Sequence, residues 1–180
     1  MNSGETPQQR GHVFRQNYFH DIGLTKHGVE GIYADNFTWD LEISQNVFVD
    51  MGNDAIKSGS ADYIDATNNV FVDTTVPYDN YTQWMGDGEG NTVDRVYMPK
   101  WKKVFADNKD FVGTPYLEKY PELGHFFEDD HYFPNKSTFA RNVVWNPERK
   151  RNPDVNAEAR STRRTCSTTG PATTPTGSRT

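Results

Sequence analysis

Short apolar runs alternate with polar residues along the chain, and four of these runs follow one pattern. In each run an Asn precedes two aromatic or aliphatic residues, and an Asp or a second Asn stands four positions after the first Asn. The runs are QNYFHDIG, QNVFVDMG, NNVFVDT and RNVVWN. Asn46 in the second run and Asn69 in the third are 23 residues apart. A period in the low twenties, made of short alternating segments, predicts repeated β-structure in which each repeat forms one turn of a coil.

Other repeat classes fit these residues less well. Leucine-rich repeats need several Leu per repeat, and this chain has few, while ankyrin and tetratricopeptide repeats are longer and helical. A parallel β-helix remains, in which each strand pairs with the same strand one turn away at about 4.8 Å. Because side chains alternate along a strand, we expect Ile32 and Ile56 to point inward, and likewise Leu41 and Ile43.

The four runs also predict what lies at one corner of the coil. One apolar residue from each run is expected to stack inside: Phe19, Phe48, Phe71 and Val144. The recurring Asn is expected to form a ladder along the corner: Asn17, Asn46, Asn69 and Asn142. Asn tolerates left-handed backbone angles, and its amide group can hydrogen-bond both the corner backbone and the Asn of the next turn. A structural role therefore explains this ladder better than a catalytic one.

The run GIYADNFTWDLEISQNVFVDMGNDAIKSGSADYIDATNNVFVD, followed later by YPEL and FARNVVWN, resembles right-handed parallel β-helix repeat proteins of the bacterial carbohydrate-active type. That group includes β-helical glycoside hydrolases and, more distantly, polysaccharide lyases of the pectate-lyase-like superfamily. The resemblance covers roughly residues 11 to 150. It implies the fold more specifically than the reaction, because one scaffold hosts several chemistries. It also implies a secreted or periplasmic parent protein.

Composition divides the chain into four parts. The repeats occupy residues 11–76 and return in a final turn at residues 137–150. Between them, residues 77–136 lack the pattern and are rich in aromatic residues, so we expect a partly helical insertion that packs on the coil. Residues 151–180 are predicted to form a disordered tail, because Thr, Ser, Arg, Pro and Gly cannot bury enough apolar surface to order it. A glycosylated stalk and a shifted reading frame are two further interpretations of this tail.

The insertion carries candidate helices and candidate sugar-stacking rings. Short helices are predicted at Met98–Phe105 and at Thr114–Tyr120, where Thr can cap and Pro fits the first helical position. Trp84, Trp101 and Tyr97 offer flat rings for the faces of a sugar, which would make the insertion a wall of a binding groove. The alternative is that these aromatic residues are the core of the insertion itself.

Charge and composition exclude several classes of partner. The net charge is −6, and Lys and Arg are not clustered as phosphate binding requires, so no nucleic-acid partner is expected. No apolar run has membrane-spanning length, and MNSGETPQQR lacks the features of a signal peptide. Cys166 is the only Cys, so no internal disulfide is predicted. Since only three or four turns are recognisable, we expect a C-terminal portion of a longer protein. We also expect a monomer.

The candidate chemistry lies on the segments GIYAD and DAIKSG, since ligands of the proteins that this chain resembles lie across an exposed parallel sheet. Strand alternation places Tyr33, Asp35 and Lys57 on one outer face. Glu30 and Asp54 are expected to stack just before these strands. Two neighbouring carboxylates repel each other, which raises one pKa, and a retaining glycosidase needs one protonated and one ionised carboxyl group.

Each of these groups has an alternative role. Stacked acids at a corner can also bind only backbone amides or a structural calcium ion, and no other cofactor or metal is predicted. His27 lies in a loop at the rim of the groove, where it could carry a proton or simply be solvated. Lys57 would suit a lyase as the base, but no Arg stands in the matching turns to neutralise a uronate carboxylate.

The sequence therefore predicts an all-β right-handed parallel β-helix that binds a polysaccharide or oligosaccharide. The predicted reaction is glycoside hydrolysis, with Asp35 and either Asp54 or Glu30 as the acid and the nucleophile or base. The residues expected to contact substrate are Tyr33, Lys57, His27, Trp84 and Trp101. A non-catalytic carbohydrate-binding or structural β-helix fragment is the second hypothesis, and a polysaccharide lyase is the third.

Overall fold

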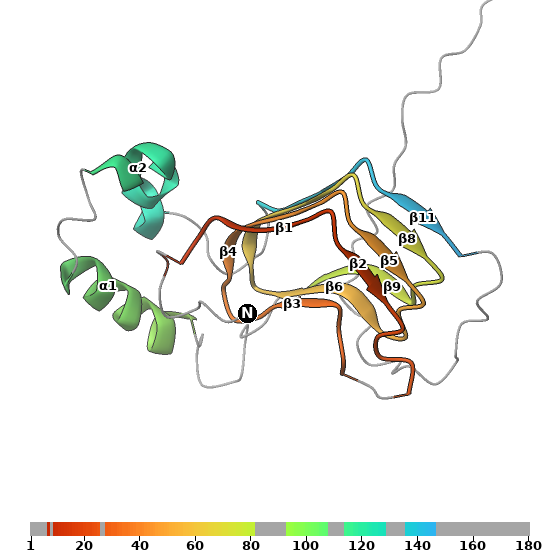
Figure 1. Ribbon diagram of the computed structural model, residues 1–180. Coiled ribbons are helices and arrows are strands. Elements are labelled where there is room, and N and C mark those ends of the chain that lie inside the picture. Colours follow the sequence, from red (N-terminus) through yellow and green to blue (C-terminus); the bar gives the residue numbers. More distant parts are fainter. Residues whose placement is uncertain are drawn as a thin grey trace, which may run out of the picture.

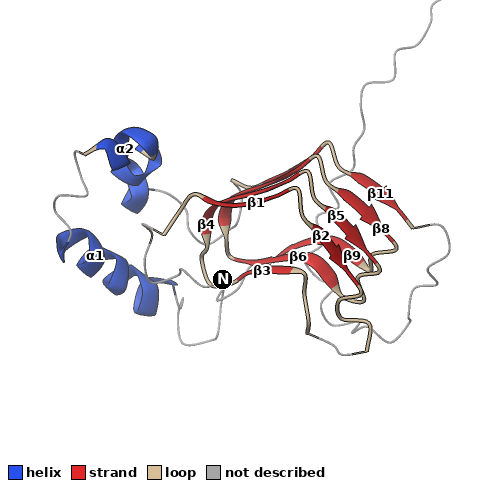
Figure 2. Cartoon of the chain, viewed as in Figure 1, coloured by secondary structure: helices blue, strands red, loops and turns tan. Residues whose placement is uncertain are grey.

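The computed structural model describes residues 7, 9–25, 28–81, 93–107, 114–128 and 136–146. The predicted tail at residues 151–180 lies outside them. Within these residues the strands form three parallel sheets (Figures 1 and 2). The first sheet contains β1 (His12–Arg15), β4 (Trp39–Ser44), β7 (Asp62–Thr67) and β10 (Thr138–Ala140). The second contains β2 (Tyr18–His20), β5 (Val47–Val49), β8 (Val70–Val72) and β11 (Val143–Trp145). The third contains β3 (Ile32–Ala34), β6 (Asp54–Gly59) and β9 (Val76–Tyr81).

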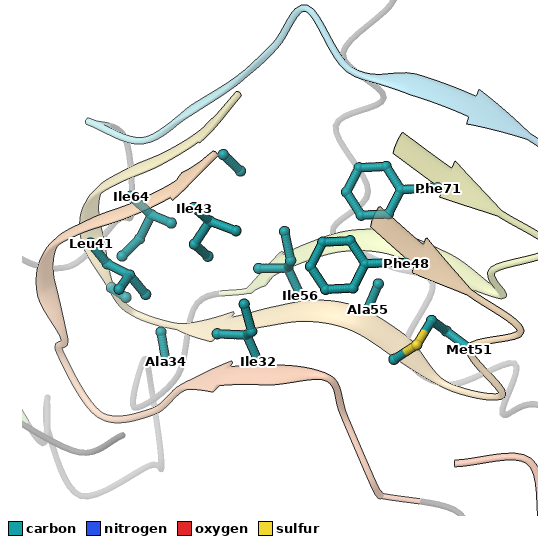
Figure 3. Close-up of a cluster of buried hydrophobic side chains, with 12 residues drawn as sticks. Ile32, Ala34, Leu41, Ile43, Phe48, Met51, Ala55, Ile56, Ile64 and Phe71 are labelled. Carbon is teal, nitrogen blue, oxygen red and sulfur yellow. The ribbon is translucent and has the colours of Figure 1, made fainter. Parts of the chain in front are cut away.

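Consecutive strands belong to different sheets, and the chain visits the three sheets in the same order each time. Every strand pairs in parallel with the strand that occupies the same place in a neighbouring repeat. The expectation of a β-rich fold with parallel sheets is confirmed. Ile32 pairs with Ile56, and both are buried, as predicted. Leu41 and Ile43 also point into the core between the sheets (Figure 3).

The aromatic stack predicted at the corner is present for three of its four members. The rings of Phe19 and Phe48 stack with centroids 4.7 Å apart, and those of Phe48 and Phe71 with centroids 5.0 Å apart. Val144 pairs with Phe71 in register, but its side chain is 47% exposed. Val144 therefore stands in the predicted row, but the prediction that it is buried was wrong, because no strand within the described residues covers β11.

The predicted Asn ladder is confirmed. Its members are Asn17, Asn46, Asn69 and Asn142. The backbone N–H of each of the first three donates to the side-chain Oδ1 of the next member at 2.8 to 2.9 Å. The side-chain amide donates to the same oxygen at 3.0 to 3.2 Å. The left-handed residue is the one before each Asn, with φ between 55° and 58°, so the Asn supplies the hydrogen bonds and its predecessor supplies the bend.

From Val93 to Glu128 the described residues of the insertion are mostly helical, and they pack beside the parallel sheets (Figure 1), whereas the first residues assigned to the insertion, up to Tyr81, belong to strand β9. A π-helical turn, η1 (Val93–Tyr97), leads into α1 (Met98–Asp107), and α2 (Pro115–Lys119) leads into the 3-10 helix η3 (Pro121–Glu128). Both predicted helices are confirmed, and α2 begins with Pro directly after Thr114, although the Thr114 side chain does not make the predicted capping hydrogen bond. Pro at the first turn costs no hydrogen bond, which explains why the helix starts there.

An aromatic cluster joins the insertion to the first parallel sheet. It consists of Phe37, Trp39, Val93, Tyr97, Trp101, Tyr120, Leu123 and Phe126. Trp101 is 0% exposed and packs edge-on against Trp39 of the first sheet, with ring centroids 5.5 Å apart. A sugar therefore finds no exposed surface on the Trp101 ring, which fits the alternative that this residue belongs to a core. Tyr97 is also buried, so the same holds for it.

Arg10 ties the segment before β1 to the same cluster. Its guanidinium forms an ion pair with Glu122 of η3, and its Nε donates to the carbonyl of Pro7 at 2.7 Å. The side chain is 1% exposed and lies near three rings: Trp39, Tyr63 and Tyr120. Burial lowers the pKa of Arg10, while the charge of Glu122 opposes that effect. This ion pair thus links η3 to the segment that precedes β1.

Candidate functional site

The outer face of the third sheet brings polar side chains into one row. Tyr33 of β3 pairs with Lys57 of β6, and Lys57 pairs with Asp79 of β9. Ile32 and Ile56, which directly precede Tyr33 and Lys57 in the sequence, are buried. Because side chains alternate along a strand, the row of polar side chains lies on the outer face. The predicted placement of Tyr33 and Lys57 on one outer face agrees with this register.

Lys57 is the centre of the cluster. Its Nζ donates a hydrogen bond to Glu30 Oε1 at 3.2 Å and lies 3.6 Å from Asp54 Oδ2. The same ammonium lies 5.5 Å from the ring centroid of Tyr33 and 5.6 Å from that of Tyr81. The side chains of Glu30 and Asp54 are only 8% and 10% exposed, so these charges interact through little solvent. The two predicted carboxylates are thus neighbours, with a cation between them.

The carboxyl group of Asp54 has an altered affinity for protons. Burial raises its pKa to about 6, and the negative charges of Asp79 and Glu30 add to this effect. The ammonium of Lys57 acts in the opposite direction. The sequence predicted the repulsion between Glu30 and Asp54, but burial is the larger cause. Near pH 6 about half of the Asp54 side chains carry a proton, which suits a general acid.

Two tyrosines close one side of the cluster. The hydroxyl oxygens of Tyr33 and Tyr81 lie 2.8 Å apart, within hydrogen-bonding distance. Burial raises the pKa of Tyr33, and Tyr81 and Asp35 raise it further, so this phenol stays protonated at neutral pH. Asp35 Oδ2 accepts a hydrogen bond from Asn36 at 3.4 Å, whereas its Oδ1 is buried and has no hydrogen-bond partner. A buried acceptor without a donor is costly, and because Oδ1 exposes no surface to solvent, it does not face a ligand in this structure.

The turn that follows Asp35 is strained and anchored in the aromatic cluster. Asn36 and Phe37 both have positive φ, 46° and 57°. This is uncommon for a residue as bulky as Phe, and burial of its ring against Trp101 at 5.3 Å between centroids offsets the strain. Thr38 Oγ1 also donates to the carbonyl of Asp35 at 3.0 Å. The insertion therefore fixes the backbone that carries Asp35.

Of the predicted site residues, the structure brings five together beside or on the third sheet: Glu30, Tyr33, Asp35, Asp54 and Lys57. Trp101 is elsewhere, in the aromatic cluster. His27 and Trp84 lie outside the described residues. The sequence did not identify Asp79 and Tyr81, because the repeat becomes hard to recognise where β9 enters the insertion. The available signal was that both residues lie about one repeat period after Lys57 in the sequence, which would have placed them on the neighbouring strand.

Removing the positive charge at Lys57 is expected to raise the pKa of Asp54. In Lys57→Met the opposing cation is lost, so the pKa of Asp54 should rise above its wild-type value of about 6. Carboxyl chemical shifts in a carbon-13 NMR titration measure this directly. Lys57→Arg keeps the charge and serves as the control, with a pKa that stays near the wild-type value. An unchanged Asp54 pKa in Lys57→Met would show that the ammonium does not act on this carboxyl group.

Within the described residues, no group of three or more His, Cys, Asp or Glu side chains is arranged to hold a metal ion. No helix in that part of the chain is long and apolar enough to cross a membrane. No family model, curated protein or solved structure matches this chain.

Proposed function

We propose that the chain is a right-handed parallel β-helix that binds a polysaccharide across the third sheet and hydrolyses a glycosidic bond there. Three features support the β-helix: strands that move from sheet to sheet in a fixed order, parallel pairing throughout, and one ladder Asn per turn. The resemblance to β-helical carbohydrate-active enzymes supports the class of ligand. The reaction is argued from the cluster around Lys57.

The raised pKa of Asp54 beside a second carboxylate is the observation on which the hydrolase proposal rests. Protonated Asp54 would donate its proton to the glycosidic oxygen while the bond from this oxygen to the anomeric carbon breaks. Glu30, hydrogen-bonded to Lys57, would attack that carbon as the nucleophile. Water would then release the sugar, returning a proton to Asp54. Neighbouring carboxylates correspond to the retaining geometry.

Tyr33, Tyr81 and Asp35 would position the sugar. The two rings offer apolar faces, and their hydroxyl groups can exchange hydrogen bonds with a ligand. The part of the Asp35 side chain that remains accessible would accept a bond from a sugar hydroxyl. Asp35 is also the alternative partner of Asp54 in an inverting reaction, in which the two carboxyl groups stand further apart and water attacks.

A second candidate function is carbohydrate binding without cleavage. It is favoured by the contacts of Lys57, whose ammonium lies close to both Glu30 and Asp54. The side chains of these two acids are at most 10% exposed. In this proposal the three charges only stabilise the start of β6. The sugar would then contact the tyrosines and Asp35, and no proton transfer would follow.

Asp54→Asn is expected to lower hydrolysis at least about 100-fold while polysaccharide binding changes little, because the general acid is lost but the contact surface remains. In the wild type, hydrolysis should fall as pH rises through about 6, where Asp54 loses its proton. Reducing-end release from a panel of polysaccharides measures cleavage, and affinity gel electrophoresis measures binding. Asp65→Asn, at an exposed carboxylate on β7 of the first sheet, is the matched control and should leave both unchanged.

The outcomes separate the candidates. Binding without cleavage by the wild-type chain would contradict the hydrolase and support the second candidate, and Tyr33→Ala should then weaken binding. Products that absorb ultraviolet light through a new carbon–carbon double bond would identify a lyase instead. Absence of binding to every polysaccharide would contradict both proposals.

A further inference from the structure

Two edges of the coil are uncovered in the described part of the chain. The first and second sheets begin with β1 and β2, which we call the early edge, and end with β10 and β11, which we call the late edge. Figure 1 shows β2 and β11 on opposite sides of the second sheet. At the late edge Phe139 is 38% and Val144 is 47% exposed. Uncovered strand edges present backbone donors and acceptors that readily pair with another chain.

The hydrogen bonds at the Asn corner have a direction, and they repeat at each joint between turns. Between the second and third turns, the backbone N–H of Asn46 donates to Asn69 Oδ1 at 2.9 Å. Asn69 Nδ2 donates to the carbonyl of Ile43 at 2.9 Å, and the N–H of Val70 donates to the carbonyl of Asn46 at 2.9 Å. The same three bonds recur at the joint before and at the joint after. Each joint thus links an earlier turn to a later one through one fixed set of groups.

The late edge presents the groups of the earlier side of such a joint, and the early edge presents the groups of the later side. At the late edge the N–H and carbonyl of Asn142 and the carbonyl of Phe139 face no further turn among the described residues. At the early edge the corresponding groups are Asn17 Oδ1, the N–H of Tyr18 and the side-chain amide of Asn17. That amide instead donates to the carbonyl of Arg15 in its own turn, at 3.1 Å. Donors on each edge therefore match acceptors on the other.

We infer that the early edge of one copy of this chain docks on the late edge of a second copy, so that copies associate head to tail. The three bonds of the ladder would then form once more across the joint. Phe19 would stand over Val144 and Phe14 over Phe139, which continues the apolar rows of the interior. The sequence led us to expect a monomer. The complementary edges argue for association, independently of any carbohydrate activity.

A second copy is the partner that fits these edges. The docking strands must run parallel to β10 and β11 and must bring an Asn to the corner in register, and the first turn of this same chain does both. Joining an early edge to a late edge is a heterologous contact, which leaves a free edge at each end and does not close. Only the first and second sheets continue across the joint, since the described fourth turn has no strand in the third. The association is therefore expected to depend on protein concentration.

Sedimentation velocity over a concentration series tests the inference. The weight-average sedimentation coefficient of the wild-type chain should rise with concentration, and Val144→Glu should abolish the rise, because it places a charge in the row that the second copy covers. Val143→Glu is the matched control. Val143 is the next residue, is 57% exposed and faces outward beside Val70, so this variant should associate like the wild type. Both positions are exposed, so neither change should impair folding.

Mixing gives a signature of head-to-tail contact. Val144→Glu keeps a working early edge, so a small fraction of it added to the wild type should shorten the assemblies, whereas Val143→Glu should not. A wild-type chain that stays monomeric at every concentration would overturn the inference. Loss of association in Val143→Glu but not in Val144→Glu would also overturn it, by moving the contact to the outer face of the second sheet.

Discussion

Asn69→Ala is expected to lower the free energy of unfolding by about 4 kcal/mol, because it leaves several buried polar groups without partners. Asn69 is 1% exposed. Its Oδ1 accepts bonds from the backbone and side-chain amides of Asn46, and its Nδ2 donates to the carbonyl of Ile43. Alanine replaces none of these bonds. The N–H of Asn46 and the carbonyl of Ile43 would stay buried, and each would lack its bond to residue 69.

Urea unfolding followed by circular dichroism measures this loss. Asn17→Ala is the matched control, since the same side chain at the early end of the ladder is exposed and accepts no bond from an earlier turn among the described residues. It should lower the free energy of unfolding by about 1 kcal/mol or less. Equal effects at the two positions would show that the Asn residues contribute only locally, and that the ladder does not couple the turns.

The parallel sheets could be predicted from the sequence because their information is periodic. Once Asn46 and Asn69 are aligned, the other residues of one repeat also have counterparts in the next repeat. The alternation of side chains along a strand then assigns Leu41 and Phe48 to the inside. Val144 shows the limit of that reasoning. Its place in the period is the same as that of Phe71, but burial depends on whether a further strand covers it, and a repeat pattern contains no such information.

The candidate site could be predicted only in part, for a related reason. Tyr33 and Lys57 follow from register and alternation, and the two acids before them follow from the same alignment. The role of the Lys57 ammonium between Glu30 and Asp54 depends on the rotamers of long side chains, which register does not determine. Burial, the main cause of the raised Asp54 pKa, likewise depends on packing around the whole cluster.

The insertion was the least predictable part. Its helices follow from local signals such as Pro115, but the partners of its aromatic residues lie far away in the sequence. Trp101 packs on Phe37 and Trp39, which belong to the coil. Aromatic residues fit a core and a sugar-binding surface equally well by composition. Only the position of Phe37, held in a strained turn beside Asp35, shows that the cluster helps to support the site.

Gly52→Ala is expected to destabilise the coil by about 3 kcal/mol or more, because the added methyl group would overlap main-chain atoms that cannot move independently. A Cβ at Gly52 would lie 2.1 Å from the carbonyl oxygen of Gly23 and 2.6 Å from the nitrogen of Leu24. Gly52 is not among the glycines with positive φ, so the cost comes from crowding between turns. Relief would require the turns to separate, which breaks the bond from the N–H of Gly52 to the carbonyl of Ile22.

Gly124→Ala separates this crowding from the general effect of replacing glycine. A Cβ at Gly124 would meet only the Cδ1 atom of Leu117, at an ordinary 3.8 Å. Gly124 lies in η3. Alanine leaves the unfolded chain fewer conformations than glycine does, so Gly124→Ala should be as stable as the wild type or slightly more stable. The midpoint of thermal unfolding should therefore fall in Gly52→Ala, and in Gly124→Ala it should stay the same or rise slightly. If Gly52→Ala unfolds at the wild-type temperature, the turns around Gly23 and Gly52 can separate at little cost, and their close contact does not stabilise the coil.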